Sequence, residues 1–225
     1  MTIKYKFDRD GETFVCETFD DLTQLHNYHD IVTIDCSCNN LAELPTLPNS
    51  LEHLDCCFNR LASLPTLPIG LTHLHCYYNL LTVLPTLPNS LEYLNCSSNE
   101  LSVLPKLPDN LEYINCSYNI LTVLPTLPNN LLRIHCHGNN LQLLPTFGDS
   151  LKFNYYYNNP VYESIRDKCR GDINIYHREN EIYANKLVRW YLDCRENPVF
   201  KFCRDRLNKE YDALLMNEDA NEIMN

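Results

Sequence analysis

The sequence predicts an α/β solenoid, because a unit of twenty residues repeats along most of the chain. Copies of the unit begin at Ile31, Leu51, Leu71, Leu91, Leu111 and Leu131, and a degraded seventh copy begins at Leu151. Within each copy, positions 1, 4, 6, 11, 14 and 17 are apolar in nearly every case, and position 9 is always Asn. A fixed period of this length indicates one supersecondary unit stacked on itself around a continuous core.

The first half of each copy predicts a short β-strand. Positions 3 to 7 alternate between outward and inward residues, as in residues 93–97, which read Tyr-Leu-Asn-Cys-Ser. Period-two alternation is typical of a strand with one buried face. Because the copies are nearly identical, we expect the strands to lie parallel and in register and to form a sheet on the concave face of the solenoid.

The second half of each copy reads Leu-Pro-x-Leu-Pro and predicts an extended return. Proline fixes φ and has no N–H to donate, so two prolines three residues apart do not suit a regular helix. They do suit a polyproline-like chain. We therefore expect extended, polyproline-like chain on the convex face.

The invariant Asn at position 9 is interpreted as structural. An interior Asn has both donor and acceptor groups, and it can satisfy buried backbone groups of its own rung and of the next rung. The predicted ladder consists of Asn39, Asn59, Asn79, Asn99, Asn119, Asn139 and Asn159.

Six of the 12 cysteines occupy position 6 of the repeat, where an apolar residue is expected. They are Cys36, Cys56, Cys76, Cys96, Cys116 and Cys136. Reduced Cys behaves as a small hydrophobe, and parallel side chains in a ladder are poorly oriented for a disulfide. We expect these cysteines to be reduced and buried, as in a reducing compartment.

The chain is expected to have three parts: an N-terminal cap at 1–30, the solenoid at 31–159 and a helical C-terminal cap or accessory region at 160–225. A solenoid needs caps because its first and last rungs expose the core. The cap at 1–30 predicts a β-hairpin around Asp10-Gly11, followed by a short helix over 20–28 with acidic residues in its first turn.

The end of the solenoid predicts a return to helix. Asn159 and Pro160 suit the cap and the first turn of a helix. Beyond them, the apolar residues take a helical spacing from residue 172 onward.

The pattern Leu-x-x-Leu-x-Cys-x-x-Asn-x-Leu resembles the leucine-rich repeat consensus. The length of twenty residues with Leu-Pro-x-Leu-Pro is similar to the short subtype found in secreted effectors of pathogenic bacteria. The Asn-, Tyr- and Cys-rich composition of the copies is also similar to leucine-rich repeat proteins encoded by giant DNA viruses of amoebae. The resemblance implies a binding module and says little about the partner.

The outward strand positions supply the candidate binding residues. These side chains are rich in Tyr, His and Asn, and aromatic residues with a polar tip are enriched at protein interfaces. The predicted binding set on the concave face is His53, Asp55, His73, His75, Tyr77, Tyr93, Asn95, Tyr113, Asn115, Arg133, His135, His137, Tyr155 and Tyr157. The set varies from rung to rung while the core does not, as expected of a surface shaped for a particular partner.

No metal, cofactor or catalytic residue is predicted. His53, Asp55, Cys57, His73 and His75 include the ligand types of zinc. However, they project from a flat sheet, and no Cys-x-x-Cys pair frames them. Side chains that form hydrogen bonds at an interface are the preferred interpretation.

Charge argues against nucleic acid and membrane as partners. The formal net charge is −11, and residues 31–150 contain only Arg60, Lys106 and Arg133 as basic residues. Binding to phosphates relies on clustered Lys and Arg. The N-terminus lacks the apolar stretch of a secretory signal, so the expected location is the cytoplasm, or the host-cell cytoplasm if the effector resemblance holds.

We therefore expect a non-enzymatic module that recognises a protein, possibly of a host, through its concave face. The alternative is a ubiquitin ligase or ligase adaptor that acts through the C-terminal helical region. Effectors with similar repeats carry a ligase domain with a Cys-x-Asp active site, and residues 203–205 read Cys-Arg-Asp. Three residues with one wildcard arise readily by chance, and the tail is much shorter than that domain.

Overall fold

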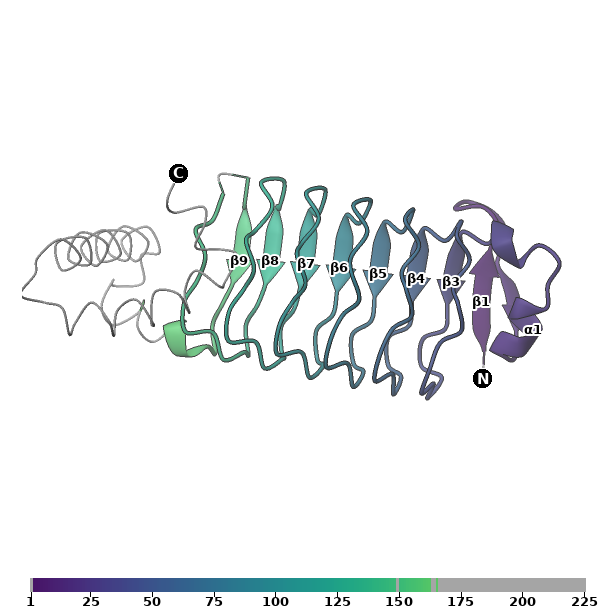
Figure 1. Ribbon diagram of the computed structural model, residues 1–225, viewed down its shortest axis with the longest axis horizontal. Coiled ribbons are helices and arrows are strands. Elements are labelled where there is room, and N and C mark those ends of the chain that lie inside the picture. The colour runs from purple at the N-terminus through teal and green to yellow at the C-terminus, as the bar shows by residue number, and fades with distance from the viewer. Residues whose placement is uncertain (1, 149, 163–164, 166–225) are drawn as a thin grey trace, which may run out of the picture. The chain divides into compact units, whose positions relative to one another are not determined.

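A computed structural model describes residues 2–148, 150–162 and 165. All of these but residue 165 lie in one compact unit, Met1–Glu163. Within this unit the repeats form parallel rungs that stand side by side in a row (Figure 1). The predicted helices beyond residue 165, and Cys203 with them, lie outside the described residues.

Seven short strands, one from each copy, form the parallel part of the sheet. They are β3 (Thr33–Asp35), β4 (His53–Asp55), β5 (His73–His75), β6 (Tyr93–Asn95), β7 (Tyr113–Asn115), β8 (Arg133–His135) and β9 (Phe153–Tyr155). Each residue pairs with the one twenty positions later, such as Leu54 with Leu74. This confirms the parallel, in-register sheet, although each strand covers only positions 3 to 5 and not 3 to 7.

The strands end early because the chain turns out of the sheet at position 8. Position 8 takes a left-handed backbone conformation in every described copy, with φ between 52° and 65°. A strand cannot continue through a residue with positive φ. The alternation in the sequence therefore continues through positions 6 and 7, but these two positions lie outside the strand.

The N-terminal residues extend the sheet. Strand β1 (Ile3–Lys6) pairs antiparallel with β2 (Phe14–Cys16) and also with β3. The expected hairpin is confirmed, and its outer strand is the end of a nine-stranded sheet in the order β2-β1-β3 to β9. Strand β1 thereby supplies hydrogen-bond partners to the first parallel strand.

The helix expected over 20–28 is shorter than predicted. Helix α1 spans Phe19–Thr23, and a 3₁₀ turn, η1, follows at Tyr28–Asp30. Thr18 caps α1, and its hydroxyl accepts from the Asp21 N–H while the Asp21 carboxylate accepts from Thr18. The Tyr28 hydroxyl donates to the Thr46 carbonyl at 2.7 Å, which anchors the cap to the first rung.

The core lies between the strands and the Leu-Pro returns. Leu91, Leu94, Cys96 and Leu101 are completely buried, as are the matching residues of the other full rungs except Leu41, which is half-buried, and Leu131, which is 2% exposed. The Leu-Pro stretches form neither helix nor strand in residues 44–148, which agrees with the predicted extended return. Residues 160–162 are helical, so the predicted change to helix does begin at Pro160.

The position-9 asparagines tie neighbouring rungs together. The Asn99 Nδ2 group donates to the Cys76 carbonyl of the preceding rung at 3.0 Å and to the Cys96 carbonyl of its own rung at 3.2 Å. Its Oδ1 accepts from the Leu81 N–H at 3.0 Å. The asparagines from Asn59 to Asn159 each bond their own rung and the preceding one rather than the next, and Asn39 bonds its own rung and Thr2.

The position-6 thiols are free and buried. Burial raises the pKa of Cys96 and Cys136 to about 12 and raises the pKa of Cys56 far above its usual value. The thiolate is the reactive form. Burial therefore protects these thiols in two ways: it keeps them protonated and it blocks access to them. Cys38, by contrast, is exposed.

We predict that a thiol reagent at pH 8 will modify Cys38 in the native protein much faster than any position-6 cysteine. Unfolding in urea should abolish the difference. Peptide mapping by mass spectrometry after timed labelling measures both rates. Equal rates for Cys38 and Cys96 in the native state would contradict the buried ladder.

Candidate functional site

The outward side chains at positions 3 and 5 of strands β3 to β9 form a surface that we call the strand face. Its main feature is a ladder of aromatic and imidazole rings. We define the ring ladder as His53, His73, His75, Tyr93, Tyr113, His135 and Tyr155. Each ring lies 4.3–5.7 Å, between centroids, from another ring of the ladder on a neighbouring strand.

The rings of the central rungs stack on one another and turn their edges outward. Tyr93 and Tyr113 are nearly parallel, with centroids 4.3 Å apart and planes at 6°. His75 stacks near Tyr93 at 4.8 Å, and His53 stacks on His73 at 4.3 Å. Stacking along the solenoid occupies ring faces, so a partner meets ring edges and polar tips.

Burial favours the uncharged form of three rings of the ladder, Tyr93, His73 and His53. Burial, with Tyr113 beside it, raises the pKa of Tyr93 to about 12. Burial lowers the pKa of His73, and burial together with His73 lowers the pKa of His53. Near pH 7 these three rings are therefore largely uncharged.

Position 5 carries oriented amides on β6 and β7. The Asn95 Oδ1 accepts from the Ser97 N–H at 3.2 Å and from the Ser97 hydroxyl at 2.8 Å. The Asn115 Oδ1 makes the same two bonds with Ser117, at 3.1 and 2.7 Å. Two donors fix the oxygen end of each amide, so the Nδ2 end is oriented away from the turn.

Position 7 is not the outward position that the alternation predicted. Cys57, Ser97, Ser117 and His137 are all buried, with His137 at 9% exposure. The prediction was wrong for these four because the strand has already ended, and their side chains lie under the turn. Tyr77 is half-buried, and Tyr157 remains exposed at 40%.

Position 8 holds exposed aromatic residues that the sequence reasoning missed. Phe58, Tyr78 and Tyr118 are about half exposed, and Phe58 stacks on Tyr78 at 4.6 Å. All three have positive φ, which is unusual for bulky residues and costs of order 1 kcal/mol each. The recurrence of aromatic residues at position 8 in three copies of the repeat could have indicated this exposed cluster from the sequence.

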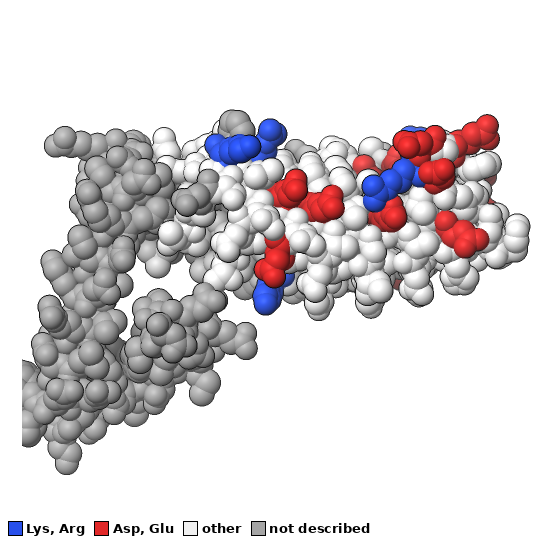
Figure 2. Space-filling model, turned by 90° about the horizontal axis from the view of Figure 1, so that it is seen from above, with Lys and Arg blue, Asp and Glu red and all other residues white. Residues whose placement is uncertain are grey.

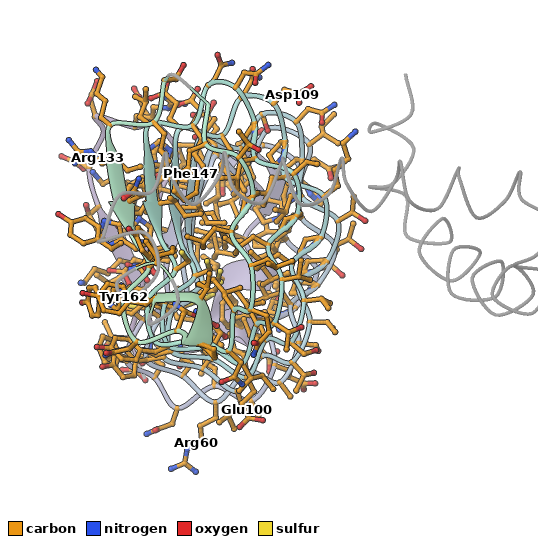
Figure 3. The ribbon with its side chains drawn as sticks, turned by 90° about the vertical axis from the view of Figure 1, so that its left-hand side faces the viewer. Arg60, Glu100, Asp109, Arg133, Phe147 and Tyr162 are labelled. Atoms are coloured by element: carbon orange, nitrogen blue, oxygen red, sulfur yellow. The ribbon has the colours of Figure 1, made fainter. Side chains whose placement is uncertain are left out.

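Charges on this side of the solenoid are few. Figure 3 looks along the row of rungs and shows Arg133 on the strand side, with Arg60 and Glu100 at the edge where strands end. Figure 2 shows the solenoid from above, where acidic and basic side chains are scattered over a largely uncharged surface and gather toward the N-terminal end. Ion pairs join Lys4 with Asp35 and Arg9 with Glu52.

The residues weighed as zinc ligands lie on or beside two neighbouring strands, β4 and β5. Across the part of the chain that the structure describes, no group of three or more His, Cys, Asp or Glu side chains is placed to hold a metal ion. His53 and His73 instead stack on each other.

No helix of the described residues is long and apolar enough to cross a bilayer.

The stacked imidazoles predict that stability decreases in mild acid. The pKa values of His53, His73, His135 and His137 are lowered by burial, so the unfolded chain binds protons more readily than the folded chain. Stability is therefore lost as pH falls from above 6.5 through the lowered pKa values. We expect a lower melting temperature at pH 5 than at pH 7.5.

A variant isolates the contribution of the stack. His53→Asn with His73→Asn should reduce the pH dependence of the melting temperature, whereas His26→Asn, at an exposed position of the cap, should leave it unchanged. An unchanged pH dependence in the double variant would contradict the interpretation.

The repeat geometry is shared with solved structures of other proteins. No protein-family model matches the chain, and no curated protein matches it. Solved structures do match. The leucine-rich repeat domain of a Shigella effector is 37% identical, covers 57% of this chain and 59% of its own, and has a TM-score of 0.55. The described repeats have the leucine-rich repeat fold.

Two further structures agree with this leucine-rich repeat fold. The leucine-rich effector YopM from Yersinia pestis is 35% identical over 55% of this chain and 42% of its own, with a TM-score of 0.53. The functional domain of InlJ from Listeria monocytogenes, which includes a cysteine ladder, is 26% identical over 60% of this chain and 32% of its own, with a TM-score of 0.51. This leucine-rich repeat chain thus matches the repeat subtype of bacterial effectors and spans less than two thirds of each matched chain.

Proposed function

We propose that this leucine-rich repeat protein is a non-enzymatic recognition module that binds a protein partner through its strand face. The observation that carries the proposal is the ring ladder on an accessible sheet face. Tyrosines at the middle of an interface are frequent energetic anchors, and Tyr93 and Tyr113 lie on the central strands β6 and β7.

Rigidity supports the same proposal. The strand face rests on in-register strands, and the position-9 asparagines bond each rung to the one before it. Side chains that are already held in place lose little entropy when they bind. The likeness to bacterial effectors favours a host protein as the partner.

The ligase alternative depends on Cys203, which lies outside the described residues. No geometry therefore favours it.

Affinity capture with matched variants tests the proposal. The full chain is immobilised as wild type, as Tyr93→Ala/Tyr113→Ala and as Val103→Ala/Val123→Ala. Both valines are 54% exposed on the Leu-Pro side of the same two rungs. We expect proteins captured by the wild type and the valine variant to be lost from the tyrosine variant, with a loss in affinity of about 2 kcal/mol or more for a purified partner.

Equal recovery by all three forms would contradict binding through the strand face. So would losses confined to the valine variant. Melting temperatures of both variants are measured first, because a loss of folding would imitate a loss of binding.

A further inference from the structure

The amides on β6 and β7 have an unused donor end. Their oxygens accept from Ser97 and Ser117, as described above, and no hydrogen bond among the described residues uses the Nδ2 group of Asn95 or Asn115. The two residues pair in register on neighbouring strands, which lie about 4.8 Å apart. They therefore present two oriented donors side by side.

Asp55 offers the opposite polarity two strands away, at the same repeat position on β4. Its Oδ1 accepts from the Cys57 N–H at 3.0 Å, so the carboxylate is held by the same type of turn as the two amides. The ion pairs that neutralise Asp35 and Glu52 do not include it. Two strand spacings place Asp55 about 10 Å from Asn95, the length of about three extended residues.

The stacked rings restrict what can bind between these points. Sugars, nucleobases and cations over an aromatic ring all require an open ring face. The faces of Tyr93 lie against Tyr113 and His75. Ring edges and hydroxyl tips remain, and these suit hydrogen bonds and close apolar contact with a peptide chain.

We propose that the strand face binds an extended peptide that crosses strands β4 to β7, with main-chain carbonyls accepting from Asn95 and Asn115 and a Lys or Arg side chain at Asp55. This inference rests on the proposed function and specifies the partner. Glu92 and Glu112 at position 2 of the same central rungs, and a net charge of −11, complement a basic peptide. They disfavour an acidic one, so the neutral main-chain carbonyl is the acceptor that fits.

Asp and Asn exchange gives matched variants. Asp35, Asp55, Asn95 and Asn115 all accept from the backbone N–H two residues later, so either residue type supports the turn. Asn95→Asp/Asn115→Asp removes the donors, and Asp55→Asn removes the charge. Asp55→Asn should keep the wild-type melting temperature, and Asn95→Asp/Asn115→Asp should lower it only slightly, because the two new carboxylates lie opposite each other on neighbouring strands.

Random peptides displayed on phage are panned against the full chain, and retained sequences are synthesised for titration calorimetry in 0.3 M salt, which screens distant charges. We expect retained peptides to contain Lys or Arg. The Asn variant should weaken binding about tenfold or more. Asp55→Asn should weaken a Lys peptide similarly and should not affect its Lys→Ala analogue.

Equal affinity of both variants and wild type for the retained peptides would overturn the inference. So would failure to retain any peptide, including the case in which glycans on an array bind instead. If Tyr93→Ala/Tyr113→Ala abolishes peptide binding while the Asp and Asn variants do not affect it, the proposed function stands and this inference fails. If none of these variants affects binding, both fail.

Discussion

Asn99→Leu is expected to destabilise the protein by roughly 2–3 kcal/mol, because it removes the hydrogen-bond acceptor that the buried Leu81 N–H has among the described residues. The leucine also cannot donate to the Cys76, Cys96 and Ser97 carbonyls. Cys76 and Cys96 keep a second donor from Asn79 and Asn119, so most of the cost arises at Leu81. Urea unfolding followed by circular dichroism measures it.

Ser98→Ala is the matched control for this prediction. Ser98 is the preceding residue, is half-buried and has φ of 53°, and both Ser and Ala pay a similar cost for that conformation. We expect a change within about 0.5 kcal/mol. Similar unfolding midpoints for Asn99→Leu and Ser98→Ala would mean that the ladder contributes little to stability.

Leu94→Ala is expected to cost about 3 kcal/mol, since the Leu94 side chain is completely buried under the centre of β6. One methine and two methyl carbons are lost, and the stacked rungs on either side limit collapse into the cavity. For a domain of this size, the melting temperature should fall by roughly 6–12 °C. Scanning calorimetry measures the shift.

Val103→Ala is the matched control, because it removes two methyl carbons from the exposed Leu-Pro side of the same rung. It should change stability by less than about 1 kcal/mol, because more than half of the side chain is already in water. If Val103→Ala and Leu94→Ala destabilised the protein equally, the assignment of Leu94 to the core and of Val103 to the surface would be contradicted.

The core residues of β6 support the outward side chains of the strand face. Asn99 and Leu94 hold β6 in place from below, while Tyr93 and Asn95 project from the same three-residue strand. A variant such as Leu94→Ala is therefore expected to weaken binding indirectly. This is why the binding tests rely on Asp and Asn exchanges and on the half-buried tyrosines of the strand face, which lie outside the core.

The period of twenty residues predicted the rungs, their register, the buried thiols and the Asn ladder correctly. Each of these depends on residue types that recur at one position, and identical units stacked in register bury identical positions. The sequence likewise indicated the N-terminal hairpin. It placed the start of α1 one residue late, because Thr18 and Asp21 form a capping box there, and it did not indicate that the helix ends at Thr23.

The recurrence of apolar residues and asparagines at fixed positions was thus sufficient to establish the solenoid and its core. Only the tertiary structure decided which polar side chains are accessible. His137 and Ser97 are buried and Tyr78 is exposed because the chain leaves the sheet through a left-handed residue at position 8, a geometry that hydrophobic alternation does not encode. Ring stacking between Tyr93 and Tyr113 likewise depends on contact between residues twenty positions apart, which arises only when the rungs are assembled.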